Sequence, residues 1–157
     1  MYEPSVVVRK ALPDDIPKAA DLIYRFYLFN EEFDPAWAAV EDRSRAEELA
    51  RNAVESEREI LLVAEENGEV VGVARAVLEE NPMLEASPLA VLKELYVKPE
   101  YRRRGIASLL VEEAFRALQE AGARALAAEF PAQNRVAKSF YEKLGFRAFR
   151  SVYIREA

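Results

Sequence analysis

The chain reads Tyr101-Arg102-Arg103-Arg104-Gly105-Ile106-Ala107-Ser108 where a strand-like run, Val91 to Val97, gives way to an amphipathic helix. The first turn of a helix has backbone N–H groups without partners inside the helix, and the helix dipole adds partial positive charge there. The three arginines increase that charge. A site of this kind binds phosphate or pyrophosphate. Taken alone, the same stretch also fits a solvated basic patch in a loop that Gly105 ends.

A second motif lies downstream, and it reads Asn134-Arg135-Val136-Ala137-Lys138-Ser139-Phe140-Tyr141-Glu142-Lys143-Leu144-Gly145-Phe146. This stretch resembles the N-x-x-A-x-x-F/L-Y-x-x-x-G-F pattern of the GNAT family of N-acetyltransferases over its whole length. The spacing of Arg102, Gly105 and Ala107 is similar to the R/Q-x-x-G-x-G/A signature of the same family. The two motifs occur in the family's order, separated by enough chain for a helix and a strand.

The resemblance implies that acetyl-CoA is the cosubstrate and that no metal takes part. Its pyrophosphate would lie on the loop of residues 102–108. The strand before the loop would lend its backbone to the acyl-pantetheine arm at Leu95, Tyr96 and Val97. Asn134, the expected cap of the following helix, and Ala137 of the second motif would complete the cosubstrate site.

Tyr141 is the main catalytic candidate that the resemblance implies, since the family places a tyrosine near the sulfur of CoA. A phenol with a pKa near 10 can protonate a leaving thiolate. The other interpretation of Tyr141 is a core tyrosine that packs beside Phe140. A base must also remove a proton from the amine. Glu94, on the same strand face as Tyr96, is the first candidate, and Glu129, on the neighbouring strand, is the second, acting directly or through water. Each also fits a solvent-facing or ion-paired strand residue.

Composition restricts the chemistry further. The 157 residues suffice for one domain, expected over 1–157, and the sequence contains neither cysteine nor histidine. A thiolate nucleophile, a histidine base and a His- or Cys-ligated metal are therefore excluded. The net charge of −6 argues against a nucleic-acid partner. We expect a cytoplasmic protein, because neither a signal peptide nor a membrane-spanning run is visible.

Hydrophobic periodicity predicts an α+β fold: a mixed, mostly antiparallel central sheet of about six to seven strands with helices on both faces. Asn67-Gly68 is a strong hairpin signal. We expect helices at about 15–30, within 36–56, and at 105–121 and 135–144. We expect strands at 5–9, 59–65, 69–78, 89–97, 124–130 and 146–155, the last of them antiparallel.

The sequence thus predicts an N-acetyltransferase that transfers an acetyl group directly to a primary amine of a small molecule or peptide. The alternative is a catalytically silent acyl-CoA-binding or sensing module of the same fold. A nucleotide-hydrolysing protein is disfavoured, because no P-loop motif occurs. Whether the chain forms a homodimer stays open. The resemblance implies that the acceptor binds over a region whose aromatic and acidic residues suit a cation, namely Tyr24, Tyr27, Asn30, Glu31, Glu32, Phe33 and Trp37. Tyr24 and Tyr27, at helical spacing, also fit core positions.

Overall fold

A five-stranded sheet in the order β1-β2-β3-β4-β5 forms the centre of the computed structural model, which describes residues 6–157. The strands β1 to β4 pair with one another in antiparallel fashion, and β5 pairs with β4 in parallel. The α+β fold and its mixed, mostly antiparallel sheet are confirmed, with five strands where about six to seven were predicted. The strands are β1 (Val6–Lys10), β2 (Glu59–Glu66), β3 (Glu69–Glu79), β4 (Leu89–Val97) and β5 (Ala125–Ala128).

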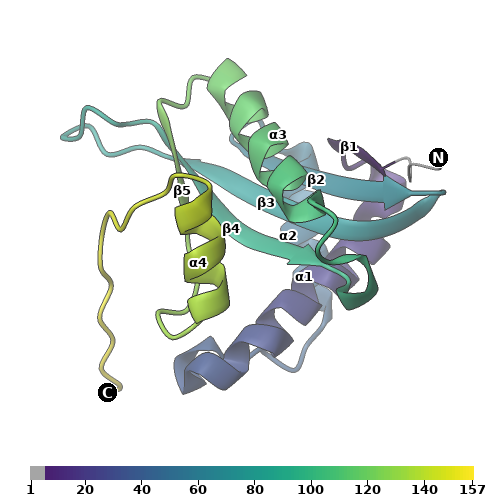
Figure 1. Cartoon of the computed structure of the whole chain (residues 1–157), viewed down its shortest axis with the longest axis horizontal. Helices are drawn as coiled ribbons and strands as arrows, with labels where there is room; N and C mark the ends of the chain where they lie inside the picture. The colour runs from purple at the N-terminus through teal and green to yellow at the C-terminus, as the bar shows by residue number, and fades with distance from the viewer. Residues whose placement is uncertain (1–5) are drawn as a thin grey trace.

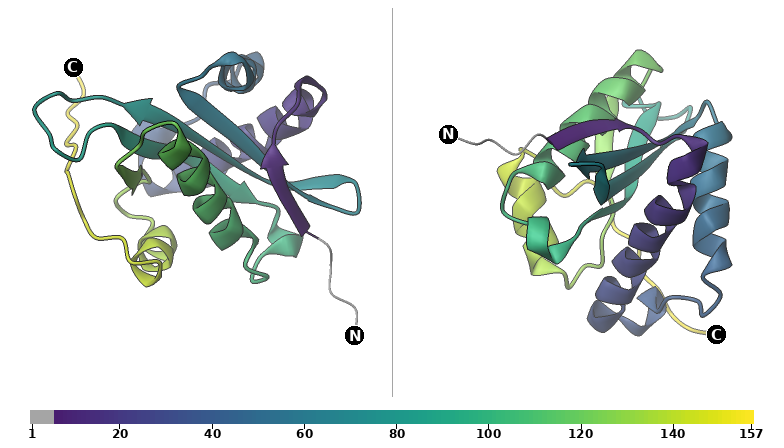
Figure 2. Two further views of the ribbon diagram at one scale, coloured as in Figure 1. Left: turned by 90° about the horizontal axis from the view of Figure 1, so that it is seen from above. Right: turned by 90° about the vertical axis from the view of Figure 1, so that its right-hand side faces the viewer.

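Helices cover both faces of the sheet (Figures 1 and 2). One face packs against α1 (Ile16–Asn30) and α2 (Ser44–Glu55), and the other against α3 (Ile106–Glu120) and α4 (Arg135–Lys143). Alternation along a strand supplies apolar side chains to both layers. In β2, for example, Leu62 joins the core under α3, whereas Leu61 and Val63 join the core under α1.

Short 3-10 turns complete the connections: Pro13–Asp15 (η1), Glu31–Phe33 (η2), Pro35–Trp37 (η3) and Pro99–Tyr101 (η4). The helix expected within residues 36–56 is therefore confined to its second half. The Asn67-Gly68 hairpin is confirmed, because both residues have positive φ, 51° and 79°, as a two-residue type I′ turn requires. None of the helices in residues 6–157 has the length and apolar character needed to cross a bilayer.

The strand predicted at 146–155 is wrong. Residues 146–157 form an extended segment that belongs to no helix or strand, and we call it the C-terminal tail. Its sequence favours a strand, but a strand exists only when a neighbour completes its hydrogen-bonded ladder. No other described strand of the chain pairs with it.

Candidate active site

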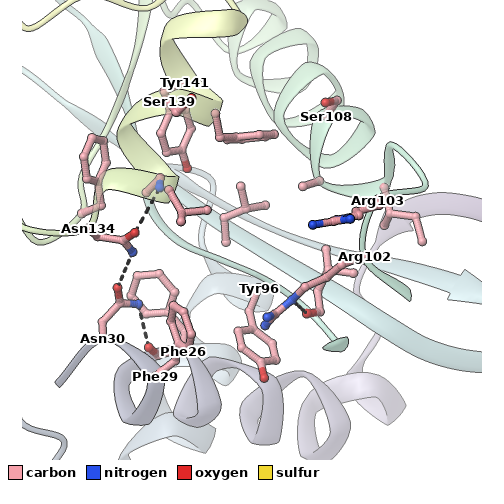
Figure 3. A pocket seen from close by; sticks show the side chains of 18 of the residues that line it. Phe26, Phe29, Asn30, Tyr96, Arg102, Arg103, Ser108, Asn134, Ser139 and Tyr141 are labelled. Carbon is pink, nitrogen blue, oxygen red and sulfur yellow. Dashed lines mark hydrogen bonds between the residues drawn. The ribbon is translucent and has the colours of Figure 1, made fainter. Parts of the chain in front are cut away.

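A cleft of about 870 Å³ opens between the C-terminal half of α1, the end of β4, the start of α3 and the helix α4 (Figure 3). It contains most of the residues that the two motifs predict for the site. From the cosubstrate set it is lined by Leu95, Tyr96, Val97, Arg102, Arg103, Gly105, Ile106, Ala107, Ser108, Asn134, Ala137 and Tyr141.

The floor of the cleft exists because β4 and β5 separate. Their pairing ends at Leu92 and Ala128, with a last backbone bond from the Glu129 N–H to the Leu92 carbonyl, while β4 continues to Val97. The register of β3 against β4 shifts between Arg75 and Ala76, which places a bulge in β4 at this point. Bulges bend a strand and change where its side chains point.

The backbone of β4 beyond the bulge offers polar groups to the cleft. The Lys98 N–H donates to the Val71 carbonyl on the β3 side, at 2.9 Å. Because consecutive residues of a strand point their N–H and C=O groups to opposite sides, those of Val97 and Leu95 point away from β3. Arg102 Nε donates to the Val97 carbonyl at 2.9 Å, in agreement with that direction. The Val97 N–H therefore lies on the open side.

The loop before α3 has the geometry of an anion cradle. Arg103 and Gly105 both have left-handed backbone conformations, with φ of 64° and 80°, and Gly105 caps the helix. A Cβ built on Gly105 meets no atom within 4 Å, so the space above it is open. Turns of this kind direct successive N–H groups toward a single anion, and the helix dipole adds to their effect.

The side chains of the three loop arginines have different contacts. Arg103 lines the cleft with an exposed side chain. Arg102 also lines it, and its guanidinium lies over the rings of Tyr96 and Phe29, at 5.2 and 5.6 Å from their centroids. Arg104 does not line the cleft; it donates to the buried Glu66 carboxylate at 3.1 and 3.2 Å. Of the three loop arginines, only Arg102 and Arg103 therefore contribute positive charge to the lining of the cleft.

Tyr141 is the only tyrosine of α4, and its ring is 6% exposed. The ring stacks on Phe130 with centroids 5.4 Å apart and contacts Phe140 and Phe146 edge-on. Tyr141 thus packs in the core, as the second interpretation predicts, and also lines the cleft; its catalytic role stays a prediction. Figure 3 shows it directed toward the cleft. Burial raises the pKa of Tyr141 above the usual 10, so the phenol keeps its proton near neutral pH.

Asn134 connects the two walls of the cleft. Its side-chain oxygen accepts from the Ala137 N–H and caps α4, while its Nδ2 donates to the Asn30 side chain at 2.9 Å. Asn30 in turn donates to the Phe26 carbonyl of α1 at 2.8 Å. Both asparagines are buried, and Figure 3 shows the continuous chain of hydrogen bonds. The start of α4 is thereby fixed to the end of α1.

The two candidate bases occupy different surroundings. Glu129 lines the cleft, and its carboxylate contacts the Lys93 ammonium at 3.1 Å and the Arg150 guanidinium at 3.3 Å. Glu94 does not line the cleft. It is fully buried under α1, where it pairs with Arg75 and accepts a hydrogen bond from the Tyr27 hydroxyl at 2.7 Å. Burial and the adjacent Glu94 charge raise the pKa of Tyr27 above its usual value.

Sequence reasoning missed several lining residues. Phe26 and Phe29 lie three residues apart on α1, a spacing that the periodicity analysis could have assigned to one face. Arg135 and Lys143 add positive charge from α4. Among the residues expected to bind an acceptor, only Asn30 lines this cleft; the other six, Tyr24, Tyr27, Glu31, Glu32, Phe33 and Trp37, lie outside its lining.

Comparison with known proteins agrees with this geometry. The sequence profile of the acetyltransferase (GNAT) family matches residues 23–146, which include both motifs. An uncharacterized N-acetyltransferase, YhfO, of Bacillus subtilis is 26% identical over 139 residues, covering 88% of each chain. An aminoglycoside N(6')-acetyltransferase type 1 of Stenotrophomonas maltophilia is 27% identical and covers 99% of this chain and 95% of its own.

A solved structure has the same fold. The aminoglycoside N-acetyltransferase AAC(6')-Iy, crystallised in complex with CoA, superposes with a TM-score of 0.82 at 17% identity, covering 99% of this chain and 97% of its own. That likeness concerns the fold, and the profile match over most of the chain identifies the family. The chain belongs to the acetyltransferase (GNAT) family and is an N-acetyltransferase of that family.

Proposed function

We propose that this chain, acting as a single domain, transfers an acetyl group from acetyl-CoA directly to a primary amine of a small molecule. The observation that carries the proposal is the continuity of one cleft. It runs from the left-handed loop before α3, along the open side of β4, to the Tyr141 side chain. The loop that would bind phosphate and the Tyr141 hydroxyl that would donate a proton thus line the same cleft of about 870 Å³.

The donor set suits the anionic end of acetyl-CoA. The cradle offers unpaired N–H groups of the first turn of α3, open space above Gly105, and the charges of Arg102 and Arg103. Arg135 and Lys143 extend the positive lining, against one carboxylate, Glu129, among the residues that form the cleft. The open backbone of Leu95 and Val97 is suited to pair with the amide groups of a pantetheine arm.

Acetyl-CoA supplies the acetyl group as an activated thioester. The Val97 N–H, on the open side of β4, donates a hydrogen bond to the thioester carbonyl oxygen, where negative charge develops. Tyr141 gives its proton to the sulfur as the carbon–sulfur bond breaks. A raised phenol pKa is compatible with this role, because the same apolar surroundings also raise the pKa of the departing thiol.

Glu129 is the base that the geometry favours, because its carboxylate reaches the cleft and that of Glu94 does not. The ammonium of the acceptor gives one proton to Glu129, directly or through water, and its nitrogen then forms the new bond to the acetyl carbon. The sulfur receives one proton from Tyr141. The nitrogen bonded to the acetyl carbon loses its second proton to solvent as the amide forms. Solvent also returns one proton to Tyr141 and removes one from Glu129, so each cycle releases one proton overall.

Direct transfer follows from the absence of cysteine, since no thiol of the chain can carry the acetyl group. The acceptor is a primary amine of a small cationic molecule. Relatives that acetylate aminoglycosides support this class. Acidic side chains also follow Asn30 at the end of α1: Glu31 and Glu32 are exposed, and Asp34 is half-buried. An ammonium-bearing acceptor would be attracted to that end of the cleft.

A thiol-release assay tests the proposal. Because the chain has no cysteine, a thiol-reactive dye reports only the CoA that is set free. The purified protein would be given acetyl-CoA with an aminoglycoside, a polyamine, or a peptide with a free N-terminus. Release that depends on the amine, with the acetylated amine found by mass spectrometry, is expected for the small-molecule amines. Binding of acetyl-CoA without release for any amine would instead support a silent acyl-CoA-binding module.

A further inference from the structure

Two glutamates of the β2–β3 hairpin hold the segment that leads into α3, from outside the cleft. Glu66 and Glu69 flank the Asn67-Gly68 turn. The Glu69 carboxylate accepts hydrogen bonds from Lys98 Nζ at 2.9 Å and from the Tyr101 hydroxyl at 2.7 Å. The hairpin and the segment thus meet at one end of the sheet (Figure 1). These two contacts fix the start of the segment to the hairpin.

The contact between Glu66 and Arg104 is the more buried one. Glu66 is 7% exposed, whereas the side chain of Glu69 is 51% exposed. Arg104 Nη1 lies 3.1 and 3.2 Å from the two oxygens of Glu66, and among residues 6–157 no other side chain contacts that carboxylate. The Arg104 guanidinium also lies over the ring of Tyr101, 5.2 Å from its centroid. A buried carboxylate without a partner is costly, so Glu66 favours the loop conformation that brings Arg104 to it.

Arg104 stands between two residues with left-handed backbone conformations. Arg103 has a φ of 64° and Gly105 a φ of 80°. Glycine adopts such angles freely, but Arg103 carries a Cβ, and a residue of that kind keeps a positive φ only where its surroundings hold it. The contact with Glu66 is made by the very next residue. It is therefore well placed to supply this restraint.

We propose that Glu66 is a positioning residue for the cosubstrate, because through Arg104 it holds the loop in the left-handed conformation that receives the pyrophosphate. This inference rests on the proposed function, in which the loop binds that group. Glu66 and Arg104 both lie outside the lining of the cleft, so neither side chain touches the cosubstrate. The loss of Glu66 weakens the binding of the pyrophosphate and leaves the acetyl transfer itself unchanged.

Two acetyl donors test this role. Glu66→Gln removes the charge that holds Arg104 and keeps the size of the side chain. The KM for acetyl-CoA should rise about fivefold to tenfold, as expected for one charge-assisted hydrogen bond, with kcat within about twofold of wild type. S-Acetylpantetheine lacks the pyrophosphate, so its kcat/KM should be the same in Glu66→Gln and wild type. An equal fall of kcat/KM for both donors would indicate a general structural defect and overturn the proposal.

A double-mutant cycle separates positioning from direct binding. Arg104→Met removes the same contact from its exposed side, so calorimetry should find the same loss of CoA affinity as in Glu66→Gln. The double variant should lose no more, because both changes act through one contact. An arginine that bound phosphate itself would cause a further loss in the Glu66→Gln background, and additive losses would overturn the proposal. Glu65→Gln is the control, because this neighbouring carboxylate pairs with Arg9 and should leave CoA affinity unchanged.

Failure of the proposed function would have a different result. A wild-type enzyme that used S-acetylpantetheine as well as acetyl-CoA would remove the pyrophosphate site, and with it the role of Glu66. A wild-type preference for acetyl-CoA that Glu66→Gln leaves intact would overturn the positioning role alone.

Discussion

The carboxylate of Glu94 is held by the guanidinium of Arg75 in a two-pronged contact, with Arg75 Nη2 2.9 Å from Glu94 Oε2. Glu94 is fully buried, and Arg75 also reaches Glu59 at 2.9 Å. A cation and an anion at this depth are stable only as a pair, because either one alone would lose its hydration without compensation. This arrangement gives Glu94 a structural role between β3, β4 and α1.

Replacing Glu94 should therefore damage stability before it damages chemistry. Glu94→Gln leaves Arg75 with its charge buried and only one carboxylate partner, and breaking such a pair costs about 3–5 kcal/mol. The free energy of unfolding in denaturant measures this loss. Glu65→Gln is the control, since Arg9 bonds a half-exposed carboxylate there and a change below about 1 kcal/mol is expected. Equal losses in both variants would contradict the assigned role of Glu94.

Glu129→Gln should depress turnover most at low pH. There the amine is almost wholly protonated and needs a base on the enzyme, whereas rising pH deprotonates it in solvent and partly restores the rate. General-base catalysis contributes about a hundredfold or more. The measurement is a pH–rate profile of Glu129→Gln beside that of Glu79→Gln, whose carboxylate contacts the same Lys93 and Arg150 but does not line the cleft. A Glu129→Gln profile parallel to that of wild type would point to ordered water as the base.

The sequence predicted those parts of the fold that depend on residues close to one another in the chain. The hairpin at Asn67-Gly68 requires two positive φ angles, and the loop before α3 requires a left-handed residue that Gly105 supplies. Alternation and helical periodicity located β2 to β4, α3 and α4. Each of these features is determined by residues that are near one another in the sequence, so each can be predicted from the sequence alone.

The features that could not be predicted from the sequence depend on contacts between segments that are distant in the chain. The sequence ranked Glu94 before Glu129 as the base, whereas only Glu129 lines the cleft. The bulge in β4 near Glu94 arises from the pairing of β3 with β4, which the sequence does not show. Asn30 and Asn134 meet across 104 positions. The prediction of a strand at 146–155 was wrong for the same reason, because the β-propensity of a segment does not show whether a neighbouring strand is there to pair with it.

The bridge between the two asparagines predicts a separable effect on cosubstrate binding. Asn30→Ala removes the acceptor of the Asn134 Nδ2 and frees the start of α4, which lines the cleft. We expect the KM for acetyl-CoA to rise by about fivefold to tenfold, equivalent to the 1–1.4 kcal/mol of one buried hydrogen bond, with little change in kcat. Steady-state kinetics measures both. A fall in kcat at constant KM would show that Asn30 acts on the chemistry instead.

Gly105→Glu should weaken CoA binding by well over tenfold. A side chain at this position would enter the space that we propose for the pyrophosphate of CoA, and its charge would repel that anion. Gly122→Glu is the matched control, because Gly122 lies just past the other end of α3, also has positive φ, 104°, and also has open space around a built Cβ. Each substitution stores about 1–2 kcal/mol of backbone strain. Calorimetry with CoA should find a loss only at Gly105, and equal affinities for both variants would remove the phosphate site from this loop.

Tyr141→Phe should keep the affinity for acetyl-CoA and lower turnover by about a hundredfold or more, since it removes only the proton donor from a ring that still stacks on Phe130. The pH dependence of the wild-type enzyme gives an independent check. The active phenol is the protonated form, which is lost only as pH rises through its folded pKa. Burial raises that pKa above 10, so Tyr141 should impose no loss of kcat below pH 10. Tyr153→Phe, in the exposed tail, is the control and should behave as wild type. If Tyr141→Phe turned over at the wild-type rate with chemistry shown to be rate-limiting, the proton would have to reach the thiolate from water.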